Sequence, residues 1–319
     1  MTGLLDVEGL QVTFNPPTGP VQAVRGASLQ VADGEIVGVA GESGCGKSVL
    51  FRALLGLLPD TARVEGSLRF DGETMGMDGS LQAEASLIYQ NPGASLNPVF
   101  TIGQQLRLAS GTDDTTVLAG LLEQVGLPDP ARLLDSYPHE LSGGMSQRAV
   151  IALALAQSPR LLIADEPTTA LDVTTQAQVL DLIEELRDRI GLAVVLISHD
   201  LAVIRRVCER IVVLYAGQIA EHGRADQVLE APSHPYTQAL LQSIPRPETA
   251  GRQLASIPGL VPDGRTPIAG CAFAPRCTHA RDACRASQPA ALPVRPGHAA
   301  ACILVDPAHA ADENRADST

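Results

Sequence analysis

The chain has 319 residues, of which 45% are hydrophobic and 3% aromatic, with no tryptophan and a formal net charge of −13. This length allows one large domain, or one domain with a smaller companion, and the hydrophobic content is sufficient for a core. The acidic balance argues against nucleic acid or an anionic lipid surface as the main partner, because both attract basic patches.

Targeting and membrane-spanning signals are missing from the sequence pattern. Residues 1–8 contain no basic segment leading into a long apolar run, so we expect no signal peptide. The longest apolar stretches, 149–156 and 192–197, fall well short of the roughly 20 residues that cross a bilayer. We therefore expect a cytosolic protein, in which the six cysteines indicate thiols or metal ligands before disulfides.

The N-terminal part leads into a phosphate-binding loop. Residues 4–14 and 27–37 alternate in hydrophobicity and predict antiparallel strands, with a turn at 15–20. An apolar run at 35–40 predicts a short strand that enters a G-x-x-x-x-G-K-[ST] motif, and helical spacing of apolar residues follows the motif. The motif consists of Gly41, Glu42, Ser43, Gly44, Cys45, Gly46, Lys47 and Ser48.

The chemistry of this loop follows from its residue types. Glycines let backbone N–H groups turn inward around an anion, and the following helix directs its positive dipole end at the phosphates. Lys47 can reach the terminal phosphates, and the Ser48 hydroxyl can bind Mg²⁺. The flanking elements disfavour a chance glycine-rich turn, although the loop alone indicates only a nucleoside triphosphate. Phe14 can stack on an adenine ring or lie buried in its strand.

A strand at 87–90 ends in Gln90. The Gln90 amide can ligate Mg²⁺, orient an attacking water, or merely cap a surface loop. Helical spacing follows at 102–110 and 115–125, broken by a glycine and proline at 126–128.

A second anion-seeking helix start comes next. Ser142 is a good N-cap, and Gly143 and Gly144 allow close approach of the backbone to an anion. The residues 145–157 that follow are rich in alanine and leucine and predict a helix.

Carboxylates and a histidine follow two further predicted strands. An apolar strand ends in Asp165, which suits Mg²⁺, and Glu166, which suits a general base polarising the attacking water. The alternative is that both acids merely end a buried strand. Asp172 begins a turn into an amphipathic helix at 174–190. A strand at 192–197 leads to His199. A lone histidine at the end of a strand is usually structural. The place of His199 after both nucleotide motifs favours contact with a γ-phosphate instead.

Together these motifs resemble the ATP-binding-cassette (ABC) ATPases. The phosphate loop, Gln90, LSGGM at 141–145, LLIADEP at 161–167, ALD at 170–172 and SHD at 198–200 occur in the order of that family. The resemblance covers roughly residues 1–235. It implies an α/β fold of ABC type, with a RecA-like core, an antiparallel β subdomain and a helical subdomain at about 98–157.

The resemblance also implies a composite site. Two cassettes pack head to tail, so that each ATP lies between the Lys47 loop of one chain and Ser142, Gly143 and Gly144 of the other. Glu166 is then the catalytic base, His199 the γ-phosphate switch and Asp172 a contact across the dimer. Ser48, Gln90 and Asp165 are the implied Mg²⁺ ligands, with Gln90 linking the ion to a transmembrane partner.

A finer resemblance is to the ATPase subunits of oligopeptide and dipeptide importers. It rests on YQNP and SLNP within 89–98, HPYTQALL at 234–241 and GCAFAPRC at 270–277. It implies ATP-driven peptide import with a paralogous ATPase subunit, two transmembrane permease subunits and an extracytoplasmic peptide-binding protein, at the cytoplasmic face of the membrane. Import of nickel or another small solute is the alternative. Cys45 replaces the usual serine of this loop.

Two other classes of protein fit the sequence less well. An ABC-type ATPase acting on DNA or ribosomes is disfavoured by the acidic charge and by the short interval between Gln90 and the LSGGM motif at 141–145, hereafter the signature. A nonhydrolytic binding module is disfavoured by the presence of Lys47, Asp165, Glu166 and His199.

Proline and alanine become frequent after Ile244, and the hydrophobic periodicity fades. We predict an ATPase domain at 1–240 and a small irregular C-terminal domain at 241–319 with a disordered tail. Its four cysteines can hold Zn²⁺ or an iron–sulfur cluster, and their wide spacing argues against Zn²⁺. The importer resemblance implies a [4Fe–4S] cluster; free thiols and a disulfide are the alternatives. The cysteines are Cys271, Cys277, Cys284 and Cys302, and the separate Cys208 is expected to be a buried small residue.

Overall fold

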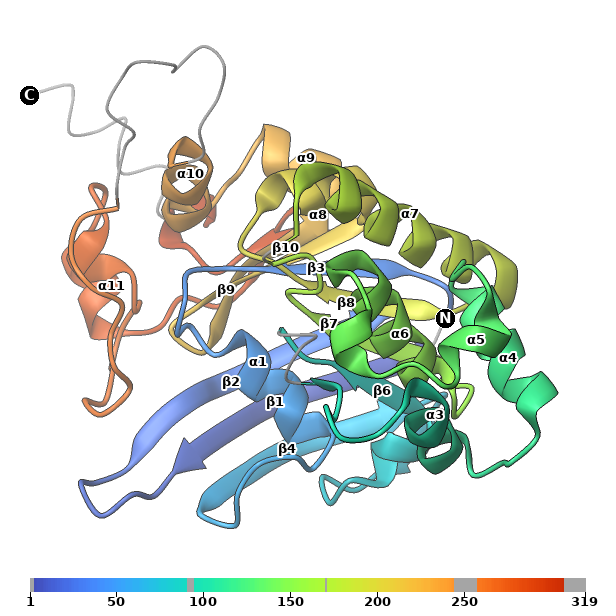
Figure 1. Cartoon of the computed structure of the whole chain (residues 1–319). Coiled ribbons are helices and arrows are strands. Elements are labelled where there is room, and N and C mark those ends of the chain that lie inside the picture. The colour runs from blue at the N-terminus through green and yellow to red at the C-terminus, as the bar shows by residue number, and fades with distance from the viewer. Residues whose placement is uncertain (1–2, 91–94, 170, 244–256, 307–319) are drawn as a thin grey trace, which may run out of the picture.

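The computed structural model describes residues 3–90, 95–169, 171–243 and 257–306. An antiparallel sheet with the strand order β2-β1-β4-β5 forms one layer (Figure 1). Its strands are β1 (Leu5–Phe14), β2 (Val21–Val31), β4 (Ala62–Phe70) and β5 (Glu73–Met75).

The second sheet has the strand order β11-β12-β10-β9-β3-β8-β7-β6. From β9 to β6 the neighbouring strands are parallel, so their carboxyl ends share one edge of the sheet. These parallel strands are β3 (Ile36–Ala40), β6 (Ala85–Ile88), β7 (Leu161–Asp165), β8 (Ala193–Ile197) and β9 (Arg210–Tyr215).

The parallel strands are mostly apolar because both faces of the sheet are covered. Side chains alternate between the two faces. Val37 and Val39 pack toward the antiparallel sheet and helix α1 (Lys47–Leu54), whereas Ile36 packs toward the other helices. The helices of that second core include α6 (Gly143–Leu155), α7 (Val173–Ile190), α8 (Leu201–Val207), α9 (Ala225–Glu230) and α10 (Pro235–Gln242).

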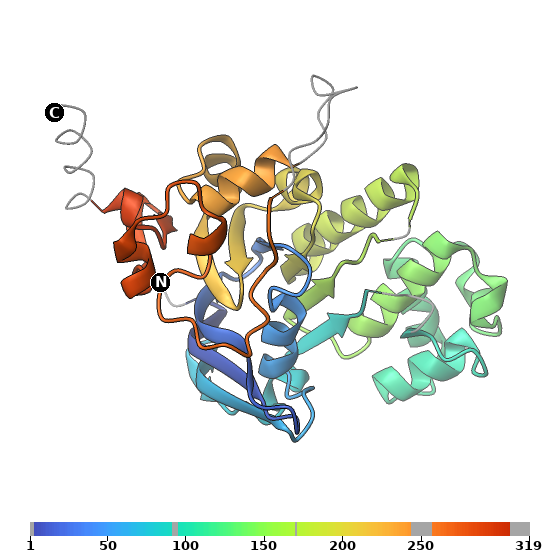
Figure 2. The same ribbon diagram turned by 90° about the vertical axis from the view of Figure 1, so that its left-hand side faces the viewer.

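A helical segment extends from the core and carries the start of α6. Its shorter helices are α3 (Ile102–Ser110), α4 (Thr115–Gln124) and α5 (Pro130–Leu133). Thr101 begins α3 with a capping box, in which its hydroxyl accepts the Gln104 N–H and the Gln104 side chain accepts the Thr101 N–H. This segment and the C-terminal region lie on opposite sides of the core (Figure 2).

The C-terminal region continues the core sheet. Strand β10 (Gln218–Arg224) pairs with β12 (His298–Ala300), which in turn pairs with β11 (Leu292–Arg295). The other described residues from 257 to 306 are irregular apart from short helical turns and α11 (Asp282–Ala286). The boundary between two domains at residue 240 therefore stays a prediction, because strands from both sides of it share one sheet.

One predicted strand was wrong. Residues 27–37 form the end of β2, a turn and the start of β3, not one strand. The turn contains Gly34 at φ 65°, and the Glu35 carboxylate accepts the Ala32 N–H at 2.8 Å. An Asp-Gly pair is a turn signal, and it outweighs the alternation of apolar residues around it.

Other expectations can be placed in the same structure. Phe14 packs, half-buried, against the core beneath the antiparallel sheet, and Cys208 is buried at the end of α8. Within the described residues, no helix is long and apolar enough to cross a membrane. The predicted disordered tail lies outside the described residues.

Candidate nucleotide site

The phosphate loop connects β3 to α1, as its motif requires. Gly41 has φ 151°, and a Cβ there would lie 2.3 Å from the Leu214 carbonyl oxygen. Gly46 caps α1 at φ 103°, and a Cβ there would lie 2.5 Å from the Ala23 carbonyl oxygen. Both positions need glycine because the loop turns tightly against neighbouring backbone.

Lys47 folds back over this loop and is only 7% exposed. Its Nζ donates to the carbonyl oxygens of Gly41 at 2.7 Å and Glu42 at 3.0 Å. Cys45 is buried beside it, and burial raises the pKa of the Cys45 thiol, so this residue acts as a small neutral core side chain. Ser43, Gly44 and Ser48 complete the loop at the start of α1.

The ends of three neighbouring strands bring further predicted residues together. Gln90 follows β6, Glu166 follows β7, and His199 follows β8. The Glu166 carboxylate accepts the Gln90 Nε2–H at 2.6 Å and the Thr169 hydroxyl at 2.9 Å. His199 Nδ1 lies 3.1 Å from the other Glu166 oxygen, and the His199 side chain is 63% exposed.

Glu166 is held in an unusual backbone conformation at φ 52°, with its N–H bonded to the Ile197 carbonyl at 2.9 Å. Burial opposes its ionisation, but hydrogen bonds from His199 and Thr169 and the charge of Lys47 lower its pKa below the ordinary value. The carboxylate is therefore ionised at neutral pH and can accept a proton from a water.

Asp165, the last residue of β7, directly precedes Glu166 and is buried. One Asp165 oxygen lies 3.8 Å from the Arg52 guanidinium on α1. Together with the Ser48 hydroxyl and the Gln90 amide, Asp165 offers the hard oxygen ligands that Mg²⁺ prefers.

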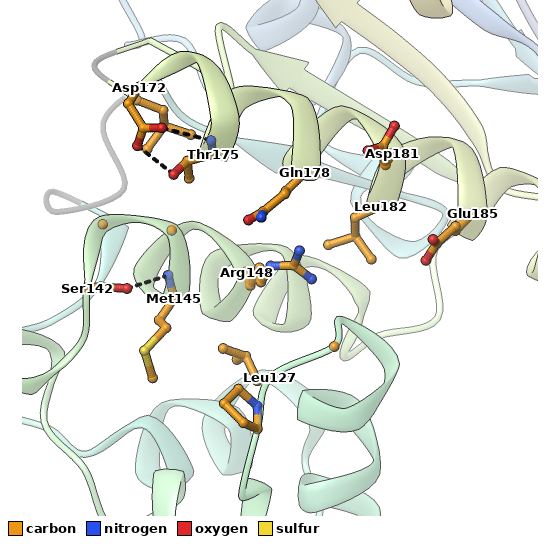
Figure 3. A pocket seen from close by; sticks show the side chains of 15 residues that line it. Leu127, Ser142, Met145, Arg148, Asp172, Thr175, Gln178, Asp181, Leu182 and Glu185 are labelled. Atoms are coloured by element: carbon orange, nitrogen blue, oxygen red, sulfur yellow. Dashed lines mark hydrogen bonds between the residues drawn. The ribbon is translucent and has the colours of Figure 1, made fainter.

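The signature residues line a separate cavity of about 700 Å³ between α6 and α7 (Figure 3). Ser142 caps α6 by accepting the Met145 N–H at 3.3 Å, and Asp172 caps α7 by accepting the N–H groups of Thr174 and Thr175. Gly144 packs so closely on α7 that a Cβ would lie 2.8 Å from Thr175. Of the described residues that line this cavity, none belongs to the phosphate loop.

The four C-terminal cysteines line one small apolar cavity, although Cys271 and Cys302 lie 31 positions apart in sequence. Burial raises the pKa of Cys271, Cys277 and Cys302, and the pKa of Cys302 reaches about 11. In the described ranges, the cysteines form no disulfide, and no three His, Cys, Asp or Glu side chains are arranged as a metal-ion site.

Sequence reasoning missed several residues of the site. Thr169 lies three residues after Glu166, and its N–H bonds to the Glu166 carbonyl in a turn. A hydroxyl at that spacing could have indicated the bond to the Glu166 carboxylate. Arg52 lies one helical turn beyond Ser48, on the α1 face toward Asp165. Tyr236 in α10 and Arg276 in the C-terminal region contact Glu42, and no local sequence pattern predicts these contacts.

Comparison with known proteins identifies the class. Residues 24–169 match the ABC transporter family, and residues 220–284 match the C-terminal region of oligopeptide/dipeptide transporters. A dimeric bacterial ABC transporter cassette superposes with a TM-score of 0.60 at 26% identity, covering 69% of this chain and 98% of that one. A cassette of an ABC transporter complex from Clostridium perfringens has a TM-score of 0.62 at 24% identity, covering 72% and 92%.

Relatives give a finer assignment. The dipeptide transport ATP-binding protein DppD of Escherichia coli is 45% identical over 313 residues, which cover 94% of this chain and 96% of that protein. The DppD protein of Bacillus subtilis is 42% identical over 322 residues, covering 96% of each. The chain therefore belongs to the family of dipeptide and oligopeptide ABC transporter ATP-binding proteins. The resemblance, the cassette fold and the ATPase class predicted from the sequence are confirmed.

Proposed function

We propose that this chain is the ATP-hydrolysing subunit that powers uptake of dipeptides or oligopeptides through an ABC transporter. One observation carries the chemical part of the proposal: the Glu166 carboxylate is gathered with Gln90, Thr169 and His199 at the sheet edge that also ends in Asp165. The transported class follows from the relatives, which are dipeptide transport ATP-binding proteins.

The residues divide the work of hydrolysis as follows. N–H groups of the phosphate loop and Lys47 bind the phosphates, and Lys47 exchanges its carbonyl contacts for phosphate oxygens. Ser48, Asp165 and Gln90 would hold Mg²⁺, and the bound ion would supply positive charge beside the phosphates. Glu166 accepts a proton from the attacking water, and His199 donates a hydrogen bond toward the γ-phosphate. Charge placement of this kind suffices, because phosphoryl transfer needs little covalent chemistry from the protein.

In this proposal the signature residues bind the ATP that a second cassette holds in its phosphate loop. Ser142, Gly143 and Gly144 present a helix start to the cavity between α6 and α7, away from the phosphate loop of the same chain. Asp172 lies at the rim of that cavity and makes the contact across the dimer. ATP closes the pair and hydrolysis reopens it. A paralogous ATPase subunit as the second cassette is consistent with the importer resemblance.

An open groove that includes Tyr89, the residue before Gln90, offers a contact for a membrane subunit. A cavity of about 420 Å³ lies between the core and α6, with Leu57 and Tyr89 exposed at its border. Apolar side chains in an open groove are typical of a protein contact. We assign this groove to one of the two permease subunits, which hold the ATPases at the cytoplasmic face and receive substrate from an extracytoplasmic peptide-binding protein. The formal net charge of −13 argues against nucleic acid as a partner.

The four C-terminal cysteines suit an iron–sulfur cluster of the [4Fe–4S] type. Their convergence on one apolar cavity supports this assignment. Binding of iron would have to deprotonate the thiols, three of which have a pKa that burial raises, and draw them together, because no three of them are arranged as a metal-ion site in the described residues. Iron and sulfide analysis of anaerobically purified protein, with its visible absorbance, tests it. Brown protein with about four irons agrees with the proposal, whereas colourless protein with one zinc replaces the cluster with a zinc site.

Uptake by the complete transporter tests the function. Proteoliposomes with the permease subunits, the paired ATPase and the binding protein should accumulate a labelled dipeptide when ATP is supplied. The same vesicles with the Glu166→Gln chain should bind ATP but accumulate little. Accumulation of nickel with no response to peptides would contradict the peptide assignment while leaving the ATPase intact.

A further inference from the structure

Two motifs of residues 220–284, the part of the chain that matches the C-terminal region of oligopeptide/dipeptide transporters, meet at one residue of the phosphate loop. The Glu42 N–H donates to the Tyr236 hydroxyl at 2.8 Å, and Tyr236 belongs to the HPYT stretch at the start of α10. The Glu42 carboxylate forms two parallel bonds with Arg276, which belongs to the GCAFAPRC stretch: Nη1 to Oε2 at 2.6 Å and Nη2 to Oε1 at 3.0 Å. Both the backbone and the side chain of Glu42 are thus held from outside the nucleotide-binding elements.

The Arg276 side chain is fixed more firmly than an ordinary surface ion pair requires. It is 5% exposed, and each of its five N–H donors has an acceptor. Besides Glu42, the acceptors are the Tyr215 hydroxyl at 3.2 Å and the carbonyl oxygens of Ile257 at 3.1 Å and Pro258 at 2.8 Å. The guanidinium also lies over the rings of Tyr215 and Phe273, at 5.8 and 6.0 Å from their centres.

The position of Glu42 makes this contact relevant to ATP. The Lys47 ammonium, which must reach the phosphates, contacts the carbonyl oxygens of Gly41 and Glu42. A free carboxylate at residue 42 would oppose a triphosphate bound in the same loop, because like charges repel. Paired with Arg276, this carboxylate is neutralised and turned toward the C-terminal region.

We propose that Arg276 is a positioning residue for ATP binding, which cancels the charge of Glu42 and fixes the first turn of the phosphate loop. This inference rests on the ATPase function of the chain. Arg276 lies among the cysteines of the C-terminal region, directly before Cys277, so that region becomes part of the nucleotide site and not an appendage to it.

A double-mutant cycle on the full chain tests the proposal. Arg276→Gln should weaken binding of a fluorescent ATP analogue by about tenfold, the effect of one uncancelled charge at moderate range. In the Glu42→Gln background, the same change should alter the Kd by less than about twofold, because no carboxylate remains to neutralise. Arg276→Lys should fall between, since lysine restores the charge without the two parallel bonds.

Two further measurements separate positioning from general structural damage. In the assembled transporter, Arg276→Gln should raise the KM for ATP while kcat changes little, because Arg276 has no contact with Glu166. Arg285→Gln is the matched control, because Arg285 lies in the same region with a 63% exposed side chain paired to Asp282 at 3.3 Å. It should leave the Kd unchanged.

Two results overturn the proposal. One is an unchanged ATP affinity in Arg276→Gln. The other is an equal loss of affinity whether Arg276→Gln is made in the unmodified chain or in the Glu42→Gln variant, which would mean that Arg276 only supports the fold of its own region. Failure of the unmodified chain to bind ATP would instead contradict the ATPase function, so the two failures are distinguishable.

Discussion

His234 begins α10 from a buried position, and we expect it to make the protein less stable as the pH falls. The residue is 3% exposed, and its Nδ1 accepts the Tyr236 N–H at 3.0 Å. Burial lowers the pKa of His234 from 6.5 to about 4, and a hydrogen bond with the Ala301 backbone partly opposes this. A proton on Nδ1 would also remove the acceptor that caps the helix.

The direction and size of this pH effect follow from the difference in proton binding between the folded and the unfolded chain. Above pH 6.5 the ring is neutral in the folded and the unfolded chain, and the full stability is present. As the pH falls from 6.5 toward the folded pKa of about 4, the unfolded chain binds a proton that the folded chain refuses. Unfolding therefore becomes easier by about 2 kcal/mol at pH 5 and by about 3 kcal/mol below pH 4.

Urea unfolding of the full chain at pH 8 and pH 5 measures this effect. Other carboxylates and histidines titrate in the same interval, so the comparison is with His234→Asn, in which asparagine keeps an N-cap acceptor without a titratable ring. The drop in unfolding free energy between pH 8 and pH 5 should be about 2 kcal/mol smaller in the variant. An equal drop in both proteins would refute the reasoning.

Three further predictions concern the nucleotide site and the contact that holds α10 and β12 to the core. Glu166→Gln should keep ATP binding and slow hydrolysis by about 10²- to 10⁴-fold in a phosphate-release assay, since it removes the proton acceptor; equal turnover would exclude Glu166 as the base. Lys47→Ala should raise the Kd for ATP by about tenfold or more, because a charge-assisted contact with phosphate is lost, and an unchanged Kd would place Lys47 outside the site. Glu221→Ala should lower the unfolding free energy by about 3–5 kcal/mol, because it leaves three buried polar groups without a partner. These are the N–H groups of Ser233 and His234 and the His298 Nε2, which bond to Glu221 at 2.7, 3.0 and 2.7 Å. Urea midpoints should show a smaller loss for Glu221→Gln, and equal midpoints for Glu221→Ala and the unmodified chain would contradict the estimate.

Much of the nucleotide-binding fold was readable in the sequence because its signals are local. Helix α3 has the predicted bounds, since Thr101 and Gln104 form a capping box at its start and Gly111 ends it. The phosphate loop was identified from fixed positions that the tight turn between β3 and α1 demands. The structure brings Gln90, Glu166 and His199 together after β6, β7 and β8, because parallel neighbouring strands have their carboxyl ends at one edge of the sheet.

The remaining features depend on contacts between distant parts of the chain. Glu42 and Arg276 lie 234 positions apart, and neither residue carries a local signal for the other. Strands β11 and β12 are three or four residues long, and Pro293 lies in one of them, so their pattern alone does not predict pairing with β10. Their place in the core sheet follows from the exposed edge that β10 offers.

The C-terminal motifs acquire a physical role in this arrangement. As sequence, HPYT and GCAFAPRC only distinguish one branch of transporter ATPases from others. In the structure, Tyr236 and Arg276 from those motifs hold the backbone and the carboxylate of Glu42. A glutamate in a loop that binds a triphosphate is electrostatically unfavourable unless a cation accompanies it. Glu42 and Arg276 are therefore best understood as a single unit, in which an acidic phosphate loop depends on the C-terminal region to bind ATP.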